Sequence, residues 1–484
     1  MTALLAWSYD LLNAREQRFF EALSVFAGGC TLETATEVCA EESEDDLDVV
    51  GLITSLVSKS LLIAEVSGDR HRYRLLESTR QYAAVKLVQR GSSEEFSRRH
   101  ARAYLEVATT LEASLDSVSD EELFNNSQWE RGNWHAALEW SLDSRHDIIL
   151  GQRIVATDSA VLWDSATLFR GRKWVAKALE LVDERTPPSL MADLELAGAA
   201  MASAFSESSP CLAAAERALS RYRSLGDEFG AARAARFAGH RLLIFERVAE
   251  GEALLSESLP TARRLRKPRL TAGLLYALSV ASSRSNDFAR ARAYVAEALE
   301  ITTAVGASRQ AAQLLACLAS IEYDAGDIEA AIRLTGDALE AERRLPRTTP
   351  SIAMTVTQMA NFLVRTGRYD EAREHAAEAL ELAVDFRFSA SVGLALQILA
   401  VQAVAGGRIT QSKTLGSYAA KLCGFAEDQM AAFAIPKIYG LTDDYDRALD
   451  VLRDALGPEE VARLMAAGAA LTEDEAIEEA RALI

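Results

Sequence analysis

The side chains that most often carry chemistry are present in this sequence, but they do not form a familiar catalytic or metal-binding pattern. No two histidines stand three or four residues apart, so no single helix face can offer two imidazoles to a metal. The HExxH and GxSxG motifs of metalloproteases and serine hydrolases are missing. The histidines are His71, His100, His135, His146, His240 and His375. We therefore expect no metal site.

The cysteines and the acidic runs also have structural explanations. Each of the five cysteines falls in an apolar helical context and none forms a CxxC pair, which favours buried thiols over disulfides. Runs such as Glu41 to Asp48 and Glu473 to Glu479 are typical of solvated faces rather than acid–base pairs. The cysteines are Cys30, Cys39, Cys211, Cys317 and Cys423. With no catalytic constellation and no cofactor motif, the chain is predicted not to be an enzyme.

Composition narrows the class of protein further. The chain has 484 residues, of which 49% are hydrophobic and 25% charged, as in Ala/Leu-rich helical proteins. A formal net charge of −19 disfavours non-specific binding to nucleic acid or to an anionic membrane. No signal peptide and no apolar run of membrane-spanning length occur, and unpaired cysteines are typical of a reducing compartment. We expect a cytoplasmic location and no membrane contact.

The middle of the chain contains a sequence repeat, and the repeated structure must position any functional side chain there. Six leucines follow one another at equal steps of about forty positions, the last step being one longer, and a small residue stands eight positions before each. The leucines are Leu179, Leu219, Leu259, Leu299, Leu339 and Leu380, and the small residues are Gly171, Cys211, Gly251, Ala291, Ala331 and Ala372. This leucine period predicts a helical solenoid, in which helix pairs stack around one long core. Solenoids recognise partners far more often than they catalyse reactions.

The N-terminal region, up to Arg90, has a different pattern. Residues 4–12 open a predicted first helix whose apolar pattern residues 16–26 continue, and a second and a third helix are predicted at residues 31–39 and 47–56. A β-type run from Lys59 to Val66, a turn at 67–69 and a second run from His71 to Leu75 predict a hairpin, and a helix from Glu77 to Val88 follows. Three helices followed by a hairpin is the order of a winged helix.

The charge of this region argues against DNA binding. Residues 1–95 hold nine Lys and Arg against sixteen Asp and Glu, and residues 47–56 hold no basic residue. A winged helix that reads DNA needs Lys or Arg on its third helix and wing to meet phosphates. Binding of nucleic acid by this domain is therefore not expected.

Three central units resemble the tetratricopeptide repeat. Each has a first helix, a polar turn, and then two small residues and a leucine in the second helix. The turns are Asn286-Asp287-Phe288, Gly326-Asp327 and Gly367-Arg368-Tyr369, and the second-helix residues are Ala291-Ala298-Leu299, Ala331-Ala338-Leu339 and Ala372-Ala379-Leu380. The resemblance implies a superhelix whose groove is lined by the first helix of each pair. Each unit is about six residues longer than the usual repeat.

Motifs along the whole chain resemble a narrower family, the bacterial STAND-type predicted ATPases related to LuxR-type and SARP-type transcriptional regulators. The motifs include residues 7–12, 23–29, 73–83, 99–101, 133–140, 415–416, 456–457 and 467–472. In that family a P-loop ATPase precedes the winged helix, yet this sequence has no GxxxxGK[ST] motif. Relatives often carry a nucleotide-sensing His-Asp pair late in the winged helix, where this chain has Leu76-Glu77. We therefore expect the chain to lack both the ATPase domain and this nucleotide contact.

These observations predict an all-α fold with one small hairpin: a winged-helix domain followed by a tetratricopeptide-like α-solenoid with a C-terminal helical cap. The predicted boundaries are 1–92 for the winged helix, 93–165 for a helical connector, 166–405 for the repeats, and 406–484 for a degenerate capping repeat with C-terminal helices.

The candidate site is the groove lined by the first helices of the best units, at about residues 269–285, 309–323 and 351–366. Polar residues there that could hold a peptide or partner protein are Arg284, Gln313, Gln358 and Asn361. The alternative is that they are ordinary solvated residues.

The leading hypothesis is a non-catalytic sensor module of a STAND-type signalling or transcription-regulatory protein. It implies a protein or peptide ligand in the groove and a nucleotide-binding ATPase module in cis or in trans, on which the winged helix packs. The alternatives are a free-standing interaction scaffold or adaptor, a fragment of an active ATPase, and a DNA-binding regulator.

Overall fold

The computed structural model describes residues 2–41, 44–67, 70–157, 168–345, 351–408, 412–432 and 442–484. The chain divides into two compact units, each of which is described by itself. The first comprises Met1–Leu115, Glu122–Trp163 and Phe169–Ala197, and the second comprises Asp116–Glu121, Asp164–Leu168 and Gly198–Ile484. Residues 158–167, where the predicted boundary at 165 falls, lie outside the described residues. The predicted boundaries at 92, 165 and 405 stay predictions.

The first unit begins with the predicted winged helix. Its helices start where side chains can cap free backbone N–H groups: Asn13 pairs reciprocally with Glu16, and Thr31 with Thr34. The elements are α1 (Thr2–Asp10), α2 (Ala14–Ala22), η1 (Leu23–Val25), α3 (Leu32–Cys39), α4 (Asp46–Ser58), β1 (Ile63–Ser67), β2 (Arg70–Arg74) and α5 (Glu77–Arg90). The strands are antiparallel, with Ile63 opposite Arg74. The predicted hairpin and the helix after it are confirmed, but the predicted first helix is two separate helices, α1 and α2, because Asn13 caps the start of α2.

The first strand begins four residues later than the sequence predicts. Helix α4 continues to Ser58, and Ser60 then takes a left-handed backbone conformation with φ of 58°. Leu61 and Leu62 are buried below the hairpin instead of pairing in it. Their apolar character reflects a core position at the helix end, which a β-type pattern imitates.

A helical connector follows the winged helix in the first unit. Its elements are α6 (Ser93–Ser114), α7 (Asp120–Ser127), α8 (Arg131–Leu138), the π-helical turn η2 (Glu139–Asp143), α9 (Ile148–Ala156), α11 (Leu168–Glu180) and α12 (Pro188–Ala204). Asn133 is fully buried and joins the connector to the winged helix. Its Oδ1 accepts the N–H of Ala27 at 2.9 Å, and its Nδ2 donates to the carbonyl of Gly29 at 3.0 Å and to the Tyr104 hydroxyl at 2.7 Å.

A buried ion pair completes this junction. The Arg72 guanidinium, on β2, binds the Glu130 carboxylate, with the two side chains only 12% and 9% exposed. The same guanidinium donates to the carbonyls of Gly28 and Gly29 at 3.2 and 3.1 Å. A side chain at Gly29 would meet the Tyr73 carbonyl oxygen at 2.7 Å, so the close approach of this loop to β2 needs glycine.

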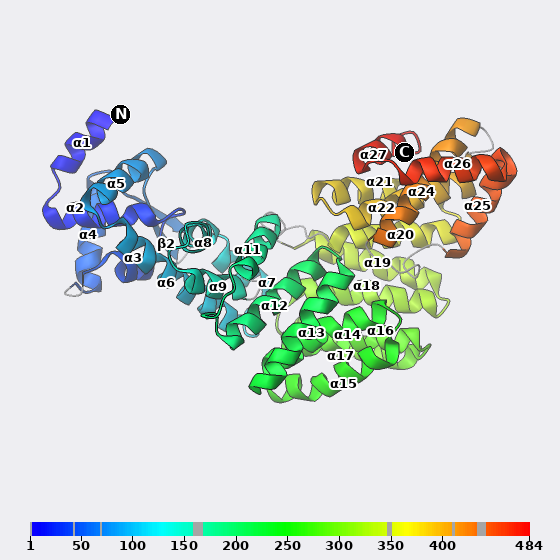
Figure 1. The fold of residues 1–484 in the computed structure, drawn as a ribbon, viewed down its shortest axis with the longest axis horizontal. Coiled ribbons are helices and arrows are strands. Elements are labelled where there is room, and N and C mark those ends of the chain that lie inside the picture. Colours follow the sequence, from blue (N-terminus) through cyan, green and yellow to red (C-terminus); the bar gives the residue numbers. More distant parts are fainter. Residues whose placement is uncertain are drawn as a thin grey trace. The chain divides into compact units, whose positions relative to one another are not determined.

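The repeats form the stack of helix pairs in the second unit (Figure 1). The elements are α13 (Ser208–Leu225), α14 (Glu228–Ile244), α15 (Val248–Arg264), α16 (Pro268–Arg284), α17 (Phe288–Ala304), α18 (Ser308–Asp324), α19 (Ile328–Arg343), α20 (Ser351–Arg365), α21 (Tyr369–Asp385) and α22 (Ser389–Ala405). Most are 17 residues long and are joined by short turns, so one helix pair with its two turns accounts for the leucine period. The predicted solenoid is confirmed.

Left-handed residues end these helices, twice in each leucine period. First helices end before Ser206, Glu246, Asn286, Gly326, Gly367 and Gly407, and second helices before Gly226, Arg266, Gly306 and Arg387, all with φ between 50° and 92°. At the turns from Ser206 to Arg387 the next N–H returns to a carbonyl five residues earlier, as in Asp287 N to Ser282 O at 2.9 Å. Asp287 then caps the following helix by accepting the N–H of Arg290. One short turn thus closes one helix and opens the next.

The small residues of the leucine period lie where the two helices of a unit cross. A side chain at Gly251, on α15, would meet the Gly239 carbonyl oxygen of α14 at 2.8 Å. The equivalent Ala291, Ala331 and Ala372 are fully buried. The periodic leucines are buried or half-buried, with Leu339 only 3% exposed. The small residues therefore lie at the crossing of the two helices, as predicted, and the periodic leucines are at least half-buried.

The segment Asp116–Glu121 packs against the starts of two repeat helices in the second unit. Asp120 forms an ion pair with Arg269 at 2.6 Å and accepts the N–H of Arg309 at 2.8 Å. Asp116 accepts the N–H of Arg269 at 3.2 Å. Carboxylates therefore meet the positive N-terminal ends of α16 and α18, where helix dipoles favour them.

The chain closes in a helical cap made of α24 (Lys413–Ala432), α25 (Thr442–Leu456), α26 (Pro458–Ala469) and α27 (Glu473–Ala480). Helices α24 and α26 cross at two glycines with almost no space between their backbones. A Cβ at Gly424 would lie 2.0 Å from the Met465 carbonyl oxygen, and one at Gly468 would lie 1.9 Å from that of Lys421. The Gly468 motif of the sequence is therefore a packing requirement.

Candidate functional site

The surface that could take a ligand is formed by the first helices of the repeat pairs. Helices α14, α16, α18, α20 and α22 contact one another in succession, whereas the second helices have no comparable mutual contacts among the described residues. The first helices therefore make the more tightly spaced layer of the stack. We call the side of this layer that the second helices do not cover the inner face.

The structure places the four predicted groove residues in four different environments. Arg284 is half-buried at the end of α16, and Gln313 is exposed on α18. Asn361 is only 8% exposed on α20. Gln358 donates to the Ala316 carbonyl at 3.1 Å and to the Ser320 hydroxyl at 2.6 Å, so it joins α20 to α18. The four residues thus span three helices, and one of them is engaged in holding the repeats together.

Aromatic and charged groups continue the inner face beyond these residues. Tyr323 on α18 stacks on Phe362 of α20, with ring centroids 4.7 Å apart. The Arg365 guanidinium lies 5.8 Å from the Tyr323 ring centroid and forms an ion pair with Asp444 at 2.9 Å. This end of the inner face is therefore neutralised by a carboxylate from the C-terminal cap.

A basic cluster lies at the other end of the inner face, around His240 on α14. Burial and the charges of Arg241, Arg236 and Arg284 hold the pKa of His240 well below its usual value, so the imidazole is neutral at pH 7. Its Nε2 is buried and has no hydrogen-bond partner among the described residues. The ring centroid lies 5.4 Å from that of Tyr276 on α16. Three guanidinium groups from two helices are therefore close enough to act electrostatically on one neutral imidazole.

Sequence reasoning identified Arg284 but not Arg241 or Arg236. The leucine period marks the positions that pack the core, and these arginines lie outside it. The available signal was their place on α14, which is the first helix of its pair, next to a histidine that has no metal-binding spacing. A search for arginines beside His240 on the first helices would have found them.

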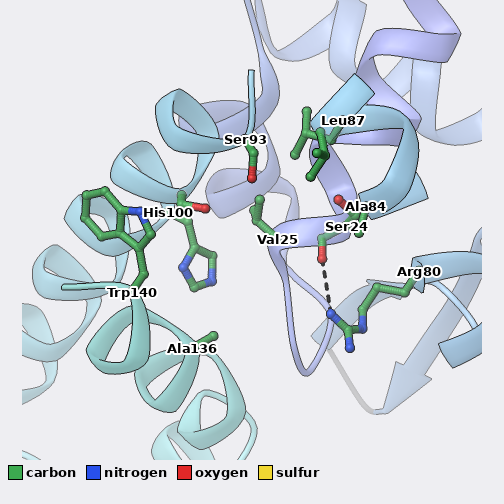
Figure 2. Close-up of a pocket in the computed structure, with 11 residues that line it drawn as sticks. Ser24, Val25, Arg80, Ala84, Leu87, Ser93, His100, Ala136 and Trp140 are labelled. Carbon is green, nitrogen blue, oxygen red and sulfur yellow. Dashed lines mark hydrogen bonds between the residues drawn. The ribbon is translucent and has the colours of Figure 1, made fainter. Parts of the chain in front are cut away.

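The first unit holds a pocket of about 200 Å³ between the winged helix and the connector. Figure 2 shows Arg80 beside Ser24, with His100 and Trp140 on the opposite side. Arg80 donates to the Ser24 carbonyl at 3.4 Å and pairs with Glu77 at 2.9 Å. The pocket is smaller than most small-molecule sites, which span about 300–1,000 Å³.

His100 in this pocket has a structural environment. Its Nε2 lies 3.3 Å from Asn133 Oδ1, within the network that joins winged helix and connector. Burial lowers the pKa of His100 to about 4, so the imidazole is neutral at pH 7. Trp140 stacks on His146 with centroids 5.3 Å apart. The pocket offers no pair of acid and base groups, and we assign it no chemistry.

The basic residues of the winged helix are held by acidic residues of the same unit. Arg74 on the wing pairs with Glu65, Lys59 pairs with Glu16 at 2.6 Å, and Arg90 pairs with Glu21. Arg15 binds Glu44 and Asp48 at 2.8 and 3.1 Å. Helix α4 carries no basic residue. The domain therefore presents little positive charge at the elements that would meet DNA phosphates.

Two further searches concern the described residues alone. None of their helices is long and apolar enough to cross a membrane. No three of their His, Cys, Asp and Glu side chains come together as a metal-binding group. All five cysteines are buried and unbridged, as the sequence predicts.

Comparison with known proteins defines the class of the first domain. Residues 12–88 match the winged helix-turn-helix domain family. The chain is 28% identical over 380 residues to "Putative HTH-type transcriptional regulator Rv0890c" of Mycobacterium tuberculosis strain H37Rv. That match covers 76% of this chain and 42% of the relative. The chain thus spans less than half the length of this curated relative, and it is homologous to it over about three quarters of its own length.

Two solved structures share the fold. One is the STAND protein PH0952 of Pyrococcus horikoshii, which has a tetratricopeptide repeat sensor. It matches with a TM-score of 0.50 at 14% identity, over 96% of this chain and 67% of that one. The other is NprR in complex with its cognate peptide NprX, with a TM-score of 0.50 at 14% identity, over 76% of this chain and 98% of that one. At this identity the likeness establishes the fold, a tetratricopeptide-like solenoid, and no more.

Proposed function

We propose that this chain is a non-catalytic sensor module of a cytoplasmic regulatory protein, and that the inner face of its repeats binds a protein or peptide ligand. The observation that carries the proposal is the contrast in charge pairing: the arginines of the winged helix are engaged within their own unit, whereas Arg241 and Arg284 on the inner face have no ion-pair partner among the described residues.

The relatives support this function without defining its ligand. A curated relative is named as a transcriptional regulator, one structural neighbour is a STAND protein with a tetratricopeptide sensor, and another binds a peptide. In the proposed mechanism, the winged helix packs on a nucleotide-binding module in cis or in trans. Ligand binding to the repeats then shifts the equilibrium between docked and released states by its differential affinity for the two.

The function is tested by measuring peptide binding and DNA binding with the full chain. We expect saturable binding of a subset of peptides on an array of random-sequence dodecapeptides, abolished when inner-face residues are replaced. We expect no gel shift with a random-sequence duplex at about 150 mM salt, because the acidic winged helix repels phosphate. A shift at that salt, with no peptide binding, would replace the proposal by a DNA-binding function.

A further inference from the structure

We propose that the basic cluster around His240 is a carboxylate-binding site, so that the ligand of the inner face is an acidic peptide. This inference rests on the proposed function and names the chemistry of its ligand. The site consists of Arg241 and His240 on α14 with Arg284 and Tyr276 on α16. A carboxylate of the peptide, from a side chain or its C-terminus, would bind between the two arginines.

Arg241 is the strongest element of the site. The residue is only 8% exposed. Its Nη2 donates to the Ser203 hydroxyl at 2.7 Å, while its Nε is buried without a hydrogen-bond partner among the described residues. A guanidinium keeps its charge at all physiological pH values, and burial of a charge without a counter-ion has a free-energy cost, which the Ser203 hydroxyl and the Cys211 thiol offset in part. A structure that retains such a group is arranged for an anion that comes from outside.

Arg284 brings a second guanidinium to the same place from the next first helix. It is half-buried and forms no ion pair among the described residues. Asp324 on α18 is a carboxylate close enough for the Arg284 charge to lower its pKa, but burial raises that pKa more strongly, and its Oδ2 accepts the Ser283 hydroxyl at 3.0 Å. Around His240 itself, the charges that act on the imidazole are those of three arginines. Arg241 therefore keeps a positive charge that no carboxylate among the described residues pairs with.

The lack of a partner for Arg241 and Arg284 does not come from a shortage of acidic residues. The chain carries a net charge of −19, and arginines elsewhere on the repeats pair with glutamates of neighbouring helices. Examples are Arg223 with Glu257 at 3.0 Å, Arg263 with Glu297 at 2.5 Å and Arg343 with Glu378 at 2.7 Å. On α16 itself, Arg269 pairs with Asp120 at 2.6 Å. Arg284 thus differs from Arg269 of its own helix, and Arg241 differs from the paired arginines of the second helices.

The surroundings favour a peptide over a polyanion. The neighbouring part of the inner face holds the uncharged side chains of Gln313, Asn361 and the half-buried Tyr323, whose ring stacks on Phe362 of the core. Amide side chains suit the backbone of an extended peptide, and aromatic rings suit its apolar side chains. A nucleic acid would need a continuous basic track, and the net negative charge opposes it. Arginine offers a planar fork of N–H donors that matches one carboxylate.

The test is an array of hexapeptide pairs that differ only in Glu against Gln, or in a free C-terminal carboxylate against an amide, probed with the full chain. The strongest pairs are then measured by fluorescence anisotropy. We expect the acidic member of a pair to bind at least about tenfold more tightly, with a preference that falls as salt is added. Arg241→Met and Arg284→Gln should each reduce the ratio of the two affinities to about one, because the acidic member of a pair loses more affinity than the Gln member.

Controls separate this inference from the proposed function. Arg223→Gln, on an outer ion pair, should keep the full preference for acidic peptides. Circular dichroism checks the fold of each variant, and the half-buried Arg284→Gln serves if Arg241→Met does not fold. Equal binding of both members of every pair, or a preference that survives both substitutions, would overturn the carboxylate site and leave peptide binding standing. Binding of no peptide at all would overturn both.

Discussion

The arginines of the winged-helix unit and those on the inner face of the repeats have opposite environments. Arg72 and Arg90 bind carboxylates of their own unit and so hold distant segments of the chain together. Arg241 is buried like Arg72, but its partners among the described residues are neutral groups, the Ser203 hydroxyl and the Cys211 thiol. An arginine with a carboxylate partner stabilises the fold, whereas one without such a partner can bind a ligand. The residue type alone does not show which of the two an arginine does.

Removal of Arg72 should produce the largest effect. Arg72→Met leaves the Glu130 carboxylate buried without a counter-charge, and we expect the first unit to lose about 3–5 kcal/mol of stability. Urea denaturation with hydrogen exchange of amides in residues 12–138 measures this loss. Arg98→Met, which removes an exposed i,i+4 pair with Glu94, is the control and should cost less than about 0.5 kcal/mol. Similar losses in the two variants would show that the Arg72 pair contributes little.

Acid should weaken the same unit through His100. The unfolded imidazole takes a proton near pH 6.5, but burial keeps the folded one neutral until its pKa of about 4. The unfolded state therefore binds more protons between these values, and stability falls as the pH falls through that window, by about 3 kcal/mol in total. Denaturation midpoints from pH 7 to pH 4 give the slope. His100→Gln should flatten it and the exposed His71→Gln should not; an unchanged slope in His100→Gln contradicts the assignment.

The repeats, which are held by turns and apolar seams rather than buried ion pairs, should respond to backbone changes. Glu246 ends α14 with φ of 60°, a conformation that a side chain disfavours. We expect Glu246→Gly to raise stability by about 0.5–1 kcal/mol in thermal denaturation. Gly326→Ala, at an equivalent turn with open space around its Cα, should lower stability by a similar amount. A loss in Glu246→Gly would indicate that its side chain contributes contacts that outweigh the turn.

The smallest effect should come from Arg241, although it is buried like Arg72. Arg241→Met removes a charge that has no carboxylate partner, so no opposite charge is left behind. We expect stability to change by less than about 1 kcal/mol, with a gain as readily as a loss. Parallel denaturation of Arg241→Met and Arg72→Met measures the contrast directly. A loss at Arg241 as large as at Arg72 would mean that Arg241 is a structural residue, and the comparison would fail.

The repeat could be predicted from the sequence because the same packing contacts recur in every unit. These contacts require residues of a given size and polarity at fixed intervals. Leu339 and Ala331 recur at fixed intervals because every unit crosses its neighbours in the same way. The hairpin was predicted with its first strand too long, since buried residues such as Leu61 and Leu62 have the composition of a strand. The bounds of the first helices agree with the predicted ones to within a residue or two.

The site was harder to predict, because a residue is available to a ligand only if no neighbouring helix already binds its side chain. Gln358 and Gln313 have the same polarity, yet one bonds a neighbouring helix and the other is exposed. Arg241 and Arg223 are the same residue type, yet only one has a glutamate beside it. Such differences depend on partners that lie one helix pair away along the chain, and a single sequence does not record which of them meet.

Because left-handed residues end the helices at equivalent positions, one helix pair could replace another without a change in the turns that join them. Gly226, Arg266 and Gly306 occupy equivalent turns. The segment from one of these turns to the next is therefore a unit that begins and ends in the same backbone conformation. Duplication or loss of residues 227–266 would join two such turns without shifting the register of any other leucine. A gene of this kind can lengthen or shorten its recognition surface by one helix pair in a single recombination, while the winged helix and the cap keep their own structure.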